Sequence, residues 1–359
     1  MTDITHSLFH GLKVCDLSTV LAGPSVGSFF AELGAEVIKI ENPRTHGDVT
    51  RSWKLASEDA NSIMSAYFAS VNVRKKYVWL DLVLDREKLN TYIAQSDILI
   101  ANFKAEDYDK FGLEKDQLHA LNPRLIIARL KGFDSDENRV AYDIALQAET
   151  GFMYMNGTPE SGPVKMPVAL IDVLAAHQLK EGILSALLVR ERTGKGSQVD
   201  CSLEKAALAS LVNQATNYLM AGHIPQRMGS LHPNIAPYGE IFECADQKQL
   251  VLASGSDKQF GKICEILSMP ETVRDPRFAN NQLRVVNRKA LQEFMTPIFK
   301  TRDRESWMND FIESDVPAGA IRSMDEVMEN PIAKSMLIDE VIDEIETRRL
   351  SGVAFQLST

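Results

Sequence analysis

The chain has 359 residues, of which 45% are hydrophobic and 25% charged, a composition typical of soluble globular proteins with about two domains. Its formal net charge is -10 at pH 7, which argues against nucleic acid as a partner, because a phosphate backbone is bound by clustered Lys and Arg. An anionic ligand would therefore need a local basic cluster. The apolar runs are far shorter than the ~18 residues of a membrane helix, and residues 1–12 show no secretory signal, so we expect no membrane partner.

The N-terminal part alternates between strand and helix patterns. The first unit is an apolar strand, a loop with Gly23-Pro24, a helix that ends at Gly34, and a second strand. The predicted strands are residues 12–17, 37–40, 77–82, 97–101 and 125–130, and the predicted helices between the later strands are residues 85–95 and 114–120. Such alternation predicts a doubly wound parallel sheet, whose ligands bind at the carboxyl ends of the strands. The loops after Leu17, Ile40, Ala101 and Leu130 are thus candidate binding loops.

The pattern changes in the second half of the chain. A loop, a long helix, a short strand and another helix are predicted at residues 156–167, 174–193, 198–202 and 203–220. A linker at residues 221–237 precedes a β-hairpin (239–244 and 250–254) and helices at 258–267, 286–299 and 304–314. We therefore expect a large α/β domain formed by residues 1–222 plus 326–359 and a small α+β domain formed by residues 223–325.

The four cysteines, Cys15, Cys201, Cys244 and Cys264, form no CxxC pair. They predict neither a zinc site nor a redox motif, and we expect no bound metal. Free thiols are typical of a reducing compartment, so the expected location is the cytoplasm.

A dinucleotide site is one interpretation of residues 11–41, a strand, a turn with glycine, a helix and a strand that ends in an acid, Glu41. The GxGxxG fingerprint is absent, because Gly23 is followed by Pro24 and the next glycine is Gly27. Without the spaced glycines the backbone cannot approach a pyrophosphate closely. We therefore expect a plain α/β unit with Glu41 in solvent.

An ordered set of short motifs spans nearly the whole chain. The motifs are DLSTVLAGP (16–24), LGAEVIKIE (33–41), GDVTRSW (47–53), LDL (80–82), ANF (101–103), NPR (122–124), KG (131–132), AYDIA (141–145), ALLVRERTGKGSQVD (186–200) and HPNIAPYG (232–239). In this set the chain resembles the class III coenzyme A (CoA) transferases. The resemblance implies a Rossmann-like doubly wound sheet, an interlocked homodimer, an acyl-CoA and a carboxylic acid as substrates, and no tightly bound cofactor.

Asp172 is the candidate catalytic residue. Taken by itself, an Asp just before a long helix is more often a cap that accepts hydrogen bonds from backbone N–H groups. The resemblance places the family's nucleophile at Asp172, which would form an acyl anhydride and then an aspartyl-CoA thioester. The two roles are compatible, because a helix N-terminus favours an ionised carboxylate and offers N–H groups to an oxyanion.

The resemblance also implies a coenzyme site. It implies Leu21 and Ala22 near the thioester, Leu80 at the nucleotide, Asn102, Phe103 and Lys104 after a strand, Lys110 at a phosphate, and Tyr142 near the reactive arm. The chain departs from some relatives at Asn42, where they carry Arg. Lys75 and Lys76 are interpreted as solvated and are left out of the site.

Two further functions remain as alternatives, an α-methylacyl-CoA racemase and a non-catalytic acyl-CoA-binding relative. In racemases of this fold a Gly-His-Asp motif supplies one of two bases, but here the same place is Ala141-Tyr142-Asp143. A phenol is a poor base near neutral pH, which favours transfer. Leu21 replaces the Gln of formyl-CoA transferases, which lowers the expectation of formyl or oxalate chemistry. Trp53 and the methionines at 153, 155 and 166 are candidates for the substrate pocket.

Overall fold

The computed structural model of the chain describes residues 4–136 and 138–358, which group into two units. The larger unit takes its described residues from Met1–Met153, Lys165–Pro225 and Ser335–Thr359. The smaller unit consists of Tyr154–Val164 and Gln226–Lys334.

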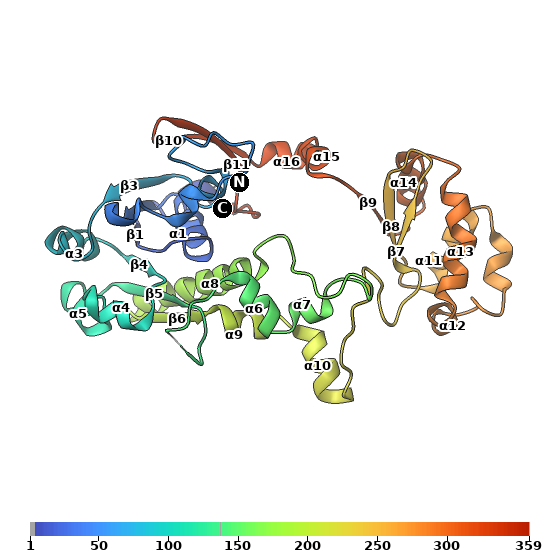
Figure 1. Cartoon of the computed structure of the whole chain (residues 1–359), viewed down its shortest axis with the longest axis horizontal. Coiled ribbons are helices and arrows are strands. Elements are labelled where there is room, and N and C mark those ends of the chain that lie inside the picture. The colour runs from blue at the N-terminus through green and yellow to red at the C-terminus, as the bar shows by residue number, and fades with distance from the viewer. Residues whose placement is uncertain (1–3, 137, 359) are drawn as a thin grey trace. The chain divides into compact units, whose positions relative to one another are not determined.

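A six-stranded parallel sheet forms the centre of the larger unit (Figure 1). Its strands are β1 (Lys13–Asp16), β2 (Glu36–Glu41), β3 (Lys75–Trp79), β4 (Ile98–Ala101), β5 (Ile126–Lys131) and β6 (Gln198–Ser202), in the order β3-β2-β1-β4-β5-β6. The central strand β4 is buried along its whole length, as expected of a parallel strand covered on both faces. The predicted α/β class with a parallel sheet is confirmed.

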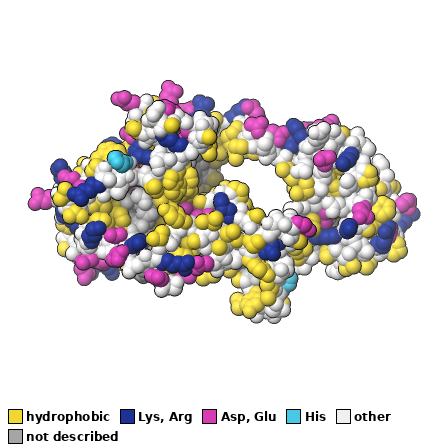
Figure 2. Space-filling view, viewed as in Figure 1, with side chains coloured by type: hydrophobic (Ala, Val, Ile, Leu, Met, Phe, Trp, Pro, Cys, Tyr) yellow, Lys and Arg dark blue, Asp and Glu magenta, His cyan; other side chains and the backbone are white. Residues whose placement is uncertain are grey.

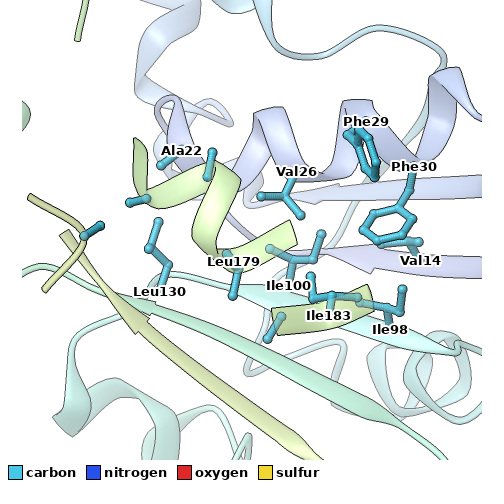
Figure 3. Packing of buried hydrophobic residues seen from close by; sticks show 14 of the residues in the cluster. Val14, Ala22, Val26, Phe29, Phe30, Ile98, Ile100, Leu130, Leu179 and Ile183 are labelled. Carbon is cyan, nitrogen blue, oxygen red and sulfur yellow. The ribbon is translucent and has the colours of Figure 1, made fainter. Parts of the chain in front are cut away.

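Helices cover both faces of this sheet. One face carries α1 (Ala22–Glu32), α8 (Leu170–Thr193) and α9 (Leu203–Ala209), and the other carries α3 (Arg86–Ala94), α4 (Ala105–Lys110) and α5 (Lys115–Leu121). Figure 3 shows side chains of α1 (Val26) and α8 (Leu179, Ile183) around Ile100 of β4, with Phe30 of α1 beside Val14 of β1. Each such buried side chain stabilises the fold by roughly 1.5–3 kcal/mol, so this layer fixes α1 and α8 relative to the strand ends.

The remaining elements of the larger unit are short. They are the 3-10 helices Thr5–Ser7, Pro43–Thr45 and Val49–Ser52, helices α2 (Ala66–Ser70), α6 (Asp143–Glu149) and α10 (Val212–Ala221), and an antiparallel hairpin of β10 (Leu337–Ile342) and β11 (Ile345–Leu350). Helix α7 (Phe152–Met155) and helix α16 (Pro331–Ser335) lie where the chain passes from one unit to the other.

The smaller unit is built on a three-stranded antiparallel sheet. Strands β7 (Tyr238–Glu243), β8 (Gln249–Ala253) and β9 (Ala318–Ile321) pair in that order, and β7 with β8 is the predicted hairpin. The helices are α11 (Asp257–Ile266), α12 (Asn281–Val286), α13 (Arg288–Phe299), α14 (Arg304–Glu313) and α15 (Met324–Met328), with a 3-10 helix at Pro270–Arg274. The apolar faces of α11, α13 and α14 share one core with the sheet, around Phe242, Phe260, Phe299 and Phe311.

Three predicted elements differ most from the structure. The strand expected at residues 77–82 is Lys75–Trp79, and the helix expected at 203–220 is split into α9 and α10, with Val212 in a left-handed conformation (φ +44°) at the break. The helix expected from residue 174 begins at Leu170. Its start is set by a hydrogen bond from another helix, because the Asp143 carboxylate accepts from the Ile171 N–H at 2.7 Å. The local sequence does not show such a partner.

Lys75 was expected in solvent, and this prediction is wrong. Its side chain is completely buried, and its Nζ lies 2.8 Å from Oδ2 of the buried Asp16. The same Nζ donates to the Pro24 carbonyl at 2.8 Å and to Asn72 Oδ1 at 2.9 Å. A Cβ at Gly27 would lie 2.7 Å from Asp16 Oδ2, so this glycine of α1 allows the helix to pack on the ion pair.

Glu41 is also buried, which corrects the expectation that it is solvated. Its two oxygens accept from Arg51 Nε at 3.0 Å and Arg51 Nη2 at 2.6 Å, and Oε1 also accepts from the Asp48 N–H at 2.8 Å. The carboxylate therefore has its own partners inside the fold. It is not placed to hold a ribose hydroxyl, which agrees with rejecting the dinucleotide interpretation.

Candidate active site

A cavity of about 200 Å³ lies where the chain leaves β1, β4 and β5, at the carboxyl edge of the sheet. Its lining residues are Thr19, Val20, Leu21, Ala22, Asn102, Phe103, Lys104, Leu130, Lys131, Gly132, Arg139, Val140, Ala141, Tyr142, Asp172 and Leu203. This edge is where parallel α/β sheets bind ligands. Seven of the residues predicted for the site are thus brought together here: Leu21, Ala22, Asn102, Phe103, Lys104, Tyr142 and Asp172.

Leu80 and Lys110 lie outside the cavity lining. Leu80 is buried in the core on the α3 and α5 side of the sheet. Lys110 is exposed at the end of α4, with its Nζ 3.7 Å from Asp107 Oδ1. Asn42, where some relatives carry Arg, accepts a hydrogen bond from the Arg44 N–H at 2.9 Å and so caps a 3-10 helix.

Asp172 lies in the first turn of α8, with Ala169 as the N-cap residue, so the capping role predicted for it is wrong. It is only 7% exposed, and its carboxylate has no hydrogen-bond partner among residues 4–136 and 138–358. Burial, together with the neighbouring charge of Asp143, raises the pKa of Asp172 to about 7. Burial thus outweighs the helix N-terminus, which was expected to favour the ionised form.

Asp143, the first residue of α6, holds the segment that carries Asp172. Its Oδ1 accepts from the Ile171 N–H, and its Oδ2 accepts from Gln147 Nε2 at 2.7 Å. Gln147 is buried and accepts from the Met166 N–H at 2.8 Å. Both ends of residues 166–171 are therefore tied to α6. The motif at 141–145 included Asp143, but nothing local to the sequence indicated these partners.

Aromatic rings lie beside the nucleophile candidate. The ring of Tyr142 is 6.3 Å from that of Trp53, which in turn lies 5.2 Å from the ring of Tyr67. Burial, and after it the negative charge of Asp172, raises the pKa of Tyr67 to about 12. Tyr67 was not predicted for the site. Neither Trp53 nor Met153, Met155 or Met166 is part of the cavity lining.

Basic side chains give the cavity the local positive charge that an acidic chain needs for an anionic ligand. Lys104, Lys131 and Arg139 all line it. Arg139 Nη1 donates to Glu149 Oε2 at 2.9 Å, and its guanidinium lies 3.9 Å from the ring of Phe133. Lys131 and Arg139 were not predicted as site residues, because single basic residues at or beyond the end of a strand carry no distinctive pattern.

Other kinds of site find little support in the described part of the chain. No group of three or more His, Cys, Asp or Glu side chains there could hold a metal ion. No helix among the described residues is long and apolar enough to span a bilayer. No histidine lines the cavity as described.

The strand ends of this parallel α/β sheet carry a buried carboxylate and several basic side chains. Such a combination is typical of an enzyme site for an anionic substrate. The chain belongs to a known group of such enzymes, CoA-transferase family III, whose family model matches residues 9–358. It is therefore an enzyme of the CoA-transferase class, which moves CoA between an acyl-CoA and an acid.

Curated relatives and a solved structure agree with this membership. The chain is 34% identical over 329 residues to the succinate–glutarate CoA-transferase of Agrobacterium fabrum, with 89% of this chain and 82% of the relative covered. It is 34% identical over 338 residues to the acetyl-CoA:oxalate CoA-transferase of Acetobacter aceti, with 92% and 85% covered. The crystal structure of a CaiB/BaiF family protein from Brucella suis superposes with a TM-score of 0.84 at 35% identity, over 99% of this chain and 93% of that one. The predicted family is confirmed.

Proposed function

We propose that Asp172 is the nucleophile of the transfer reaction. The observation that carries this proposal is the position of a buried carboxylate, without a hydrogen-bond partner in the described structure, in a cavity at the carboxyl edge of the sheet. A carboxylate with a pKa near 7 is a stronger nucleophile than one with an ordinary pKa, and it is still half ionised near pH 7.

The proposed steps conserve the thioester bond energy. An oxygen of Asp172 attacks the acyl carbon of the acyl-CoA, and the C–S bond breaks. The CoA thiolate departs, and the acyl group remains on Asp172 as a mixed anhydride. The thiolate then attacks the aspartyl carbon, which releases the donor acid and forms an aspartyl-CoA thioester. The acceptor carboxylate attacks that thioester to form a second anhydride, and the thiolate takes the new acyl group and frees Asp172.

The start of α1 supplies hydrogen-bond donors to the same cavity. Leu21 and Ala22 line it, and their backbone N–H groups are at the N-terminus of α1, where no intrahelical acceptor exists. In the described structure these N–H groups donate no hydrogen bond. We assign them the stabilisation of the oxyanion that forms when Asp172 attacks.

For the coenzyme we propose that the larger unit is the CoA-binding domain. Leu21, Ala22 and Tyr142 would contact the thioester end, Asn102 and Phe103 the pantetheine arm, and Lys104 and Lys110 the phosphates, while Leu80 would form the floor below the nucleotide. Lys104 lines the cavity and is the N-cap residue of α4, and Lys110 is the last residue of that helix, so the two ammonium groups lie at its two ends.

Lys104→Ala is expected to raise KM for the acyl-CoA about tenfold, because one charge-assisted hydrogen bond to a phosphate is lost. Its kcat should stay within about threefold of wild type, since a phosphate contact is made equally in the ground state and in the transition state. Steady-state kinetics measure both constants. Lys88→Ala is the control, because Lys88 is an exposed lysine of α3 paired with Asp85. Equal KM values for Lys104→Ala and Lys88→Ala would remove Lys104 from the coenzyme site.

For the acids we propose small dicarboxylates. The relatives in Agrobacterium and Acetobacter are named for succinate, glutarate and oxalate. The cavity here carries three basic side chains, Lys104, Lys131 and Arg139, which suit a second carboxylate as well as CoA phosphates. Incubation with succinyl-CoA and a panel of mono- and dicarboxylic acids, followed by mass spectrometry, tests this. Transfer to monocarboxylic acids only would contradict it.

The same incubation in deuterated water tests racemisation. A two-base reaction would label the α-carbon of the acyl group, whereas transfer leaves it unlabelled. Tyr142 occupies the position of the racemase base, and no histidine lines the described cavity, so we expect a new CoA ester without deuterium.

The acid limb of the kcat–pH profile is expected near pH 7, because attack needs ionised Asp172, whose pKa is raised to about 7. Asp143→Asn removes the neighbouring negative charge, which helps to hold that pKa up. The limb should therefore move to lower pH by roughly one unit. Glu181→Gln, an exposed carboxylate change on the same helix α8, should leave the profile in place. A profile that is identical in Asp143→Asn and wild type would contradict the assignment.

We further propose a homodimer of the interlocked kind that the family resemblance implies. Helix α10 has no buried residue, and Leu219 and Met220 are 78% and 85% exposed. Figure 2 shows hydrophobic side chains gathered in the region of this helix. Apolar side chains gathered in this way mark a surface that a partner covers. Light scattering that reports the mass of a single chain would contradict the dimer.

The free thiols of all four cysteines support a reducing, cytoplasmic location, which fractionation of the native cell would test.

A further inference from the structure

The loop between β1 and α1 forms one wall of the cavity, and it is held by the side chains of Asn102, Asp16 and Asp48. Thr19 is paired with the Asn102 side chain, which accepts from the Thr19 N–H at 3.0 Å and donates to its carbonyl at 2.9 Å. Ser18 is held by the Asp16 carboxylate, which accepts from its N–H at 3.0 Å. Val20, which follows Thr19, is held by Asp48, a residue that has no role in the reaction steps proposed above.

Val20 has a left-handed backbone conformation, with φ at +75°. A β-branched residue rarely adopts this conformation, because its Cβ crowds the backbone, and it does so where surrounding contacts enforce it. The enforcing contact here is the Asp48 carboxylate, whose two oxygens both lie 3.2 Å from the Val20 nitrogen.

The Asp48 carboxylate also has hydrogen-bond partners of its own. Only 2% exposed, it also accepts from the Thr50 N–H at 3.0 Å, from Thr50 Oγ1 at 2.8 Å and from Lys39 Nζ at 3.2 Å. Lys39 is equally buried, and its Nζ donates at 2.7 Å to the carbonyl of Ser18. The Lys39–Asp48 pair thus grips the loop at two points, the Ser18 carbonyl and the Val20 amide.

The left-handed turn at Val20 sets the direction in which the chain enters α1. The two residues that follow, Leu21 and Ala22, line the cavity with Asp172 and carry N–H groups without a partner in the described structure. If Val20 relaxed to an ordinary conformation, these N–H groups would rotate away from their present directions.

We propose that Asp48 is a positioning residue for the transfer reaction: with Lys39 it holds Val20 in the left-handed conformation, and this aims the first amide groups of α1 at the oxyanion formed on the substrate. The inference rests on the proposed function of the cavity. Asp48 does not line the cavity near Asp172, so its effect would pass through the backbone of Val20.

The test measures the effect of Asp48→Ala in two backgrounds, the wild-type chain and the Val20→Gly chain. In the wild-type background kcat should fall about 100-fold, as for loss of an oxyanion donor, while KM for the acyl-CoA stays within about threefold. Glycine adopts a positive φ without a steric penalty, so it no longer needs the carboxylate to hold it. In the Val20→Gly background the loss caused by Asp48→Ala should therefore be roughly tenfold smaller or less.

Thr50→Val is the matched control. It removes the Thr50 hydroxyl, another donor to the same Asp48 carboxylate, but leaves the bond to Val20, so kcat should remain at the wild-type value. Circular dichroism and thermal melting establish that each variant is folded. If Asp48→Ala does not fold, the same comparison with Asp48→Leu, which keeps much of the shape but offers no acceptor to the Val20 N–H, replaces it.

Equal kcat losses in the two backgrounds, or a Thr50→Val loss as large as that of Asp48→Ala, would overturn the proposal, because Asp48 would then act through general stability. Asp172→Asn is assayed beside these variants. Should Asp172→Asn keep full activity, the proposed nucleophile fails, whereas the coupling between Asp48 and Val20 is still read from kcat.

Discussion

Asp172→Asn is expected to bind acyl-CoA but to lower kcat by roughly 1000-fold or more, because an amide cannot attack the thioester. The amide has nearly the same shape as the carboxylate, and no hydrogen bond in the described structure depends on the charge. KM or the dissociation constant of CoA should therefore change by less than about threefold. Asp172→Ala should abolish turnover in the same way.

The stability of Asp172→Asn separates a chemical effect from a folding defect. The pKa of Asp172 is raised from 3.8 to about 7 in the folded protein. This shift does not change the free energy of unfolding below pH 3.8, where the group is protonated in both states. The free energy of unfolding then falls between about pH 4 and pH 7, and the full loss is present above pH 7. Removing this buried charge should stabilise the protein above pH 7, on the order of 3 kcal/mol. An inactive variant that is also less stable than wild type at pH 8 would mean that the substitution damages the fold.

Lys75→Met is expected to lower the free energy of unfolding by about 3–5 kcal/mol at pH 7, because it leaves Asp16 buried without its cation. Asp16 and Lys75 lie beneath the start of α1, where Lys75 also donates to the Pro24 carbonyl. Burial lowers the pKa of Lys75 to about 8, with Asp16 opposing the shift. The lysine is therefore held in the charged form by its partner. Urea unfolding, followed by circular dichroism, measures the effect.

Lys76→Met is the matched control for Lys75→Met. Lys76 is the next residue of β3, and its side chain is 71% exposed, with a salt bridge to Glu36 at 2.7 Å. Such an exposed pair contributes little, so the unfolding free energy should be nearly unchanged. Similar urea midpoints for the two variants would show that the Asp16–Lys75 pair does not stabilise the fold.

Much of the parallel sheet could be predicted because strands such as β4 and β5 are apolar runs, and because helices lie between β1 and β2, between β3 and β4, and between β4 and β5. Strand 198–202 was predicted with its observed ends, since Gly194 and Gly196 bound it on one side. The smaller unit's hairpin was visible for a similar reason, as two short strand patterns around a polar turn. Elements with local signals were therefore within reach of the sequence.

Features that depend on partners far away in the chain could not be predicted from the sequence. Lys75 looks like a surface lysine beside Lys76, and only the fold shows that Asp16, 59 positions away, neutralises it. The beginning of α8 depends on Asp143, which lies 28 positions earlier in the chain. The charge environment of Asp172 follows from the same contact, so the rise of its pKa could not be predicted.

The candidate site was predicted largely through the family resemblance. Seven of its residues line one cavity, although their roles there remain predictions. Tyr67, Lys131 and Arg139 were missed as site residues, because a single aromatic or basic residue has no spacing that sets it apart. Asp48 belonged to a quoted motif, yet its contact with Val20 depends on a backbone conformation that the sequence does not reveal.

Chemical trapping of the working enzyme tests the central assignment most directly. The protein is incubated with succinyl-CoA and a dicarboxylic acid, treated with hydroxylamine or borohydride, and digested for peptide mass spectrometry. The account predicts a hydroxamate or a reduced side chain at Asp172 in the wild-type enzyme. It predicts no modification at this position in Asp172→Asn. An unmodified Asp172 in a sample where the new CoA ester accumulates would contradict it.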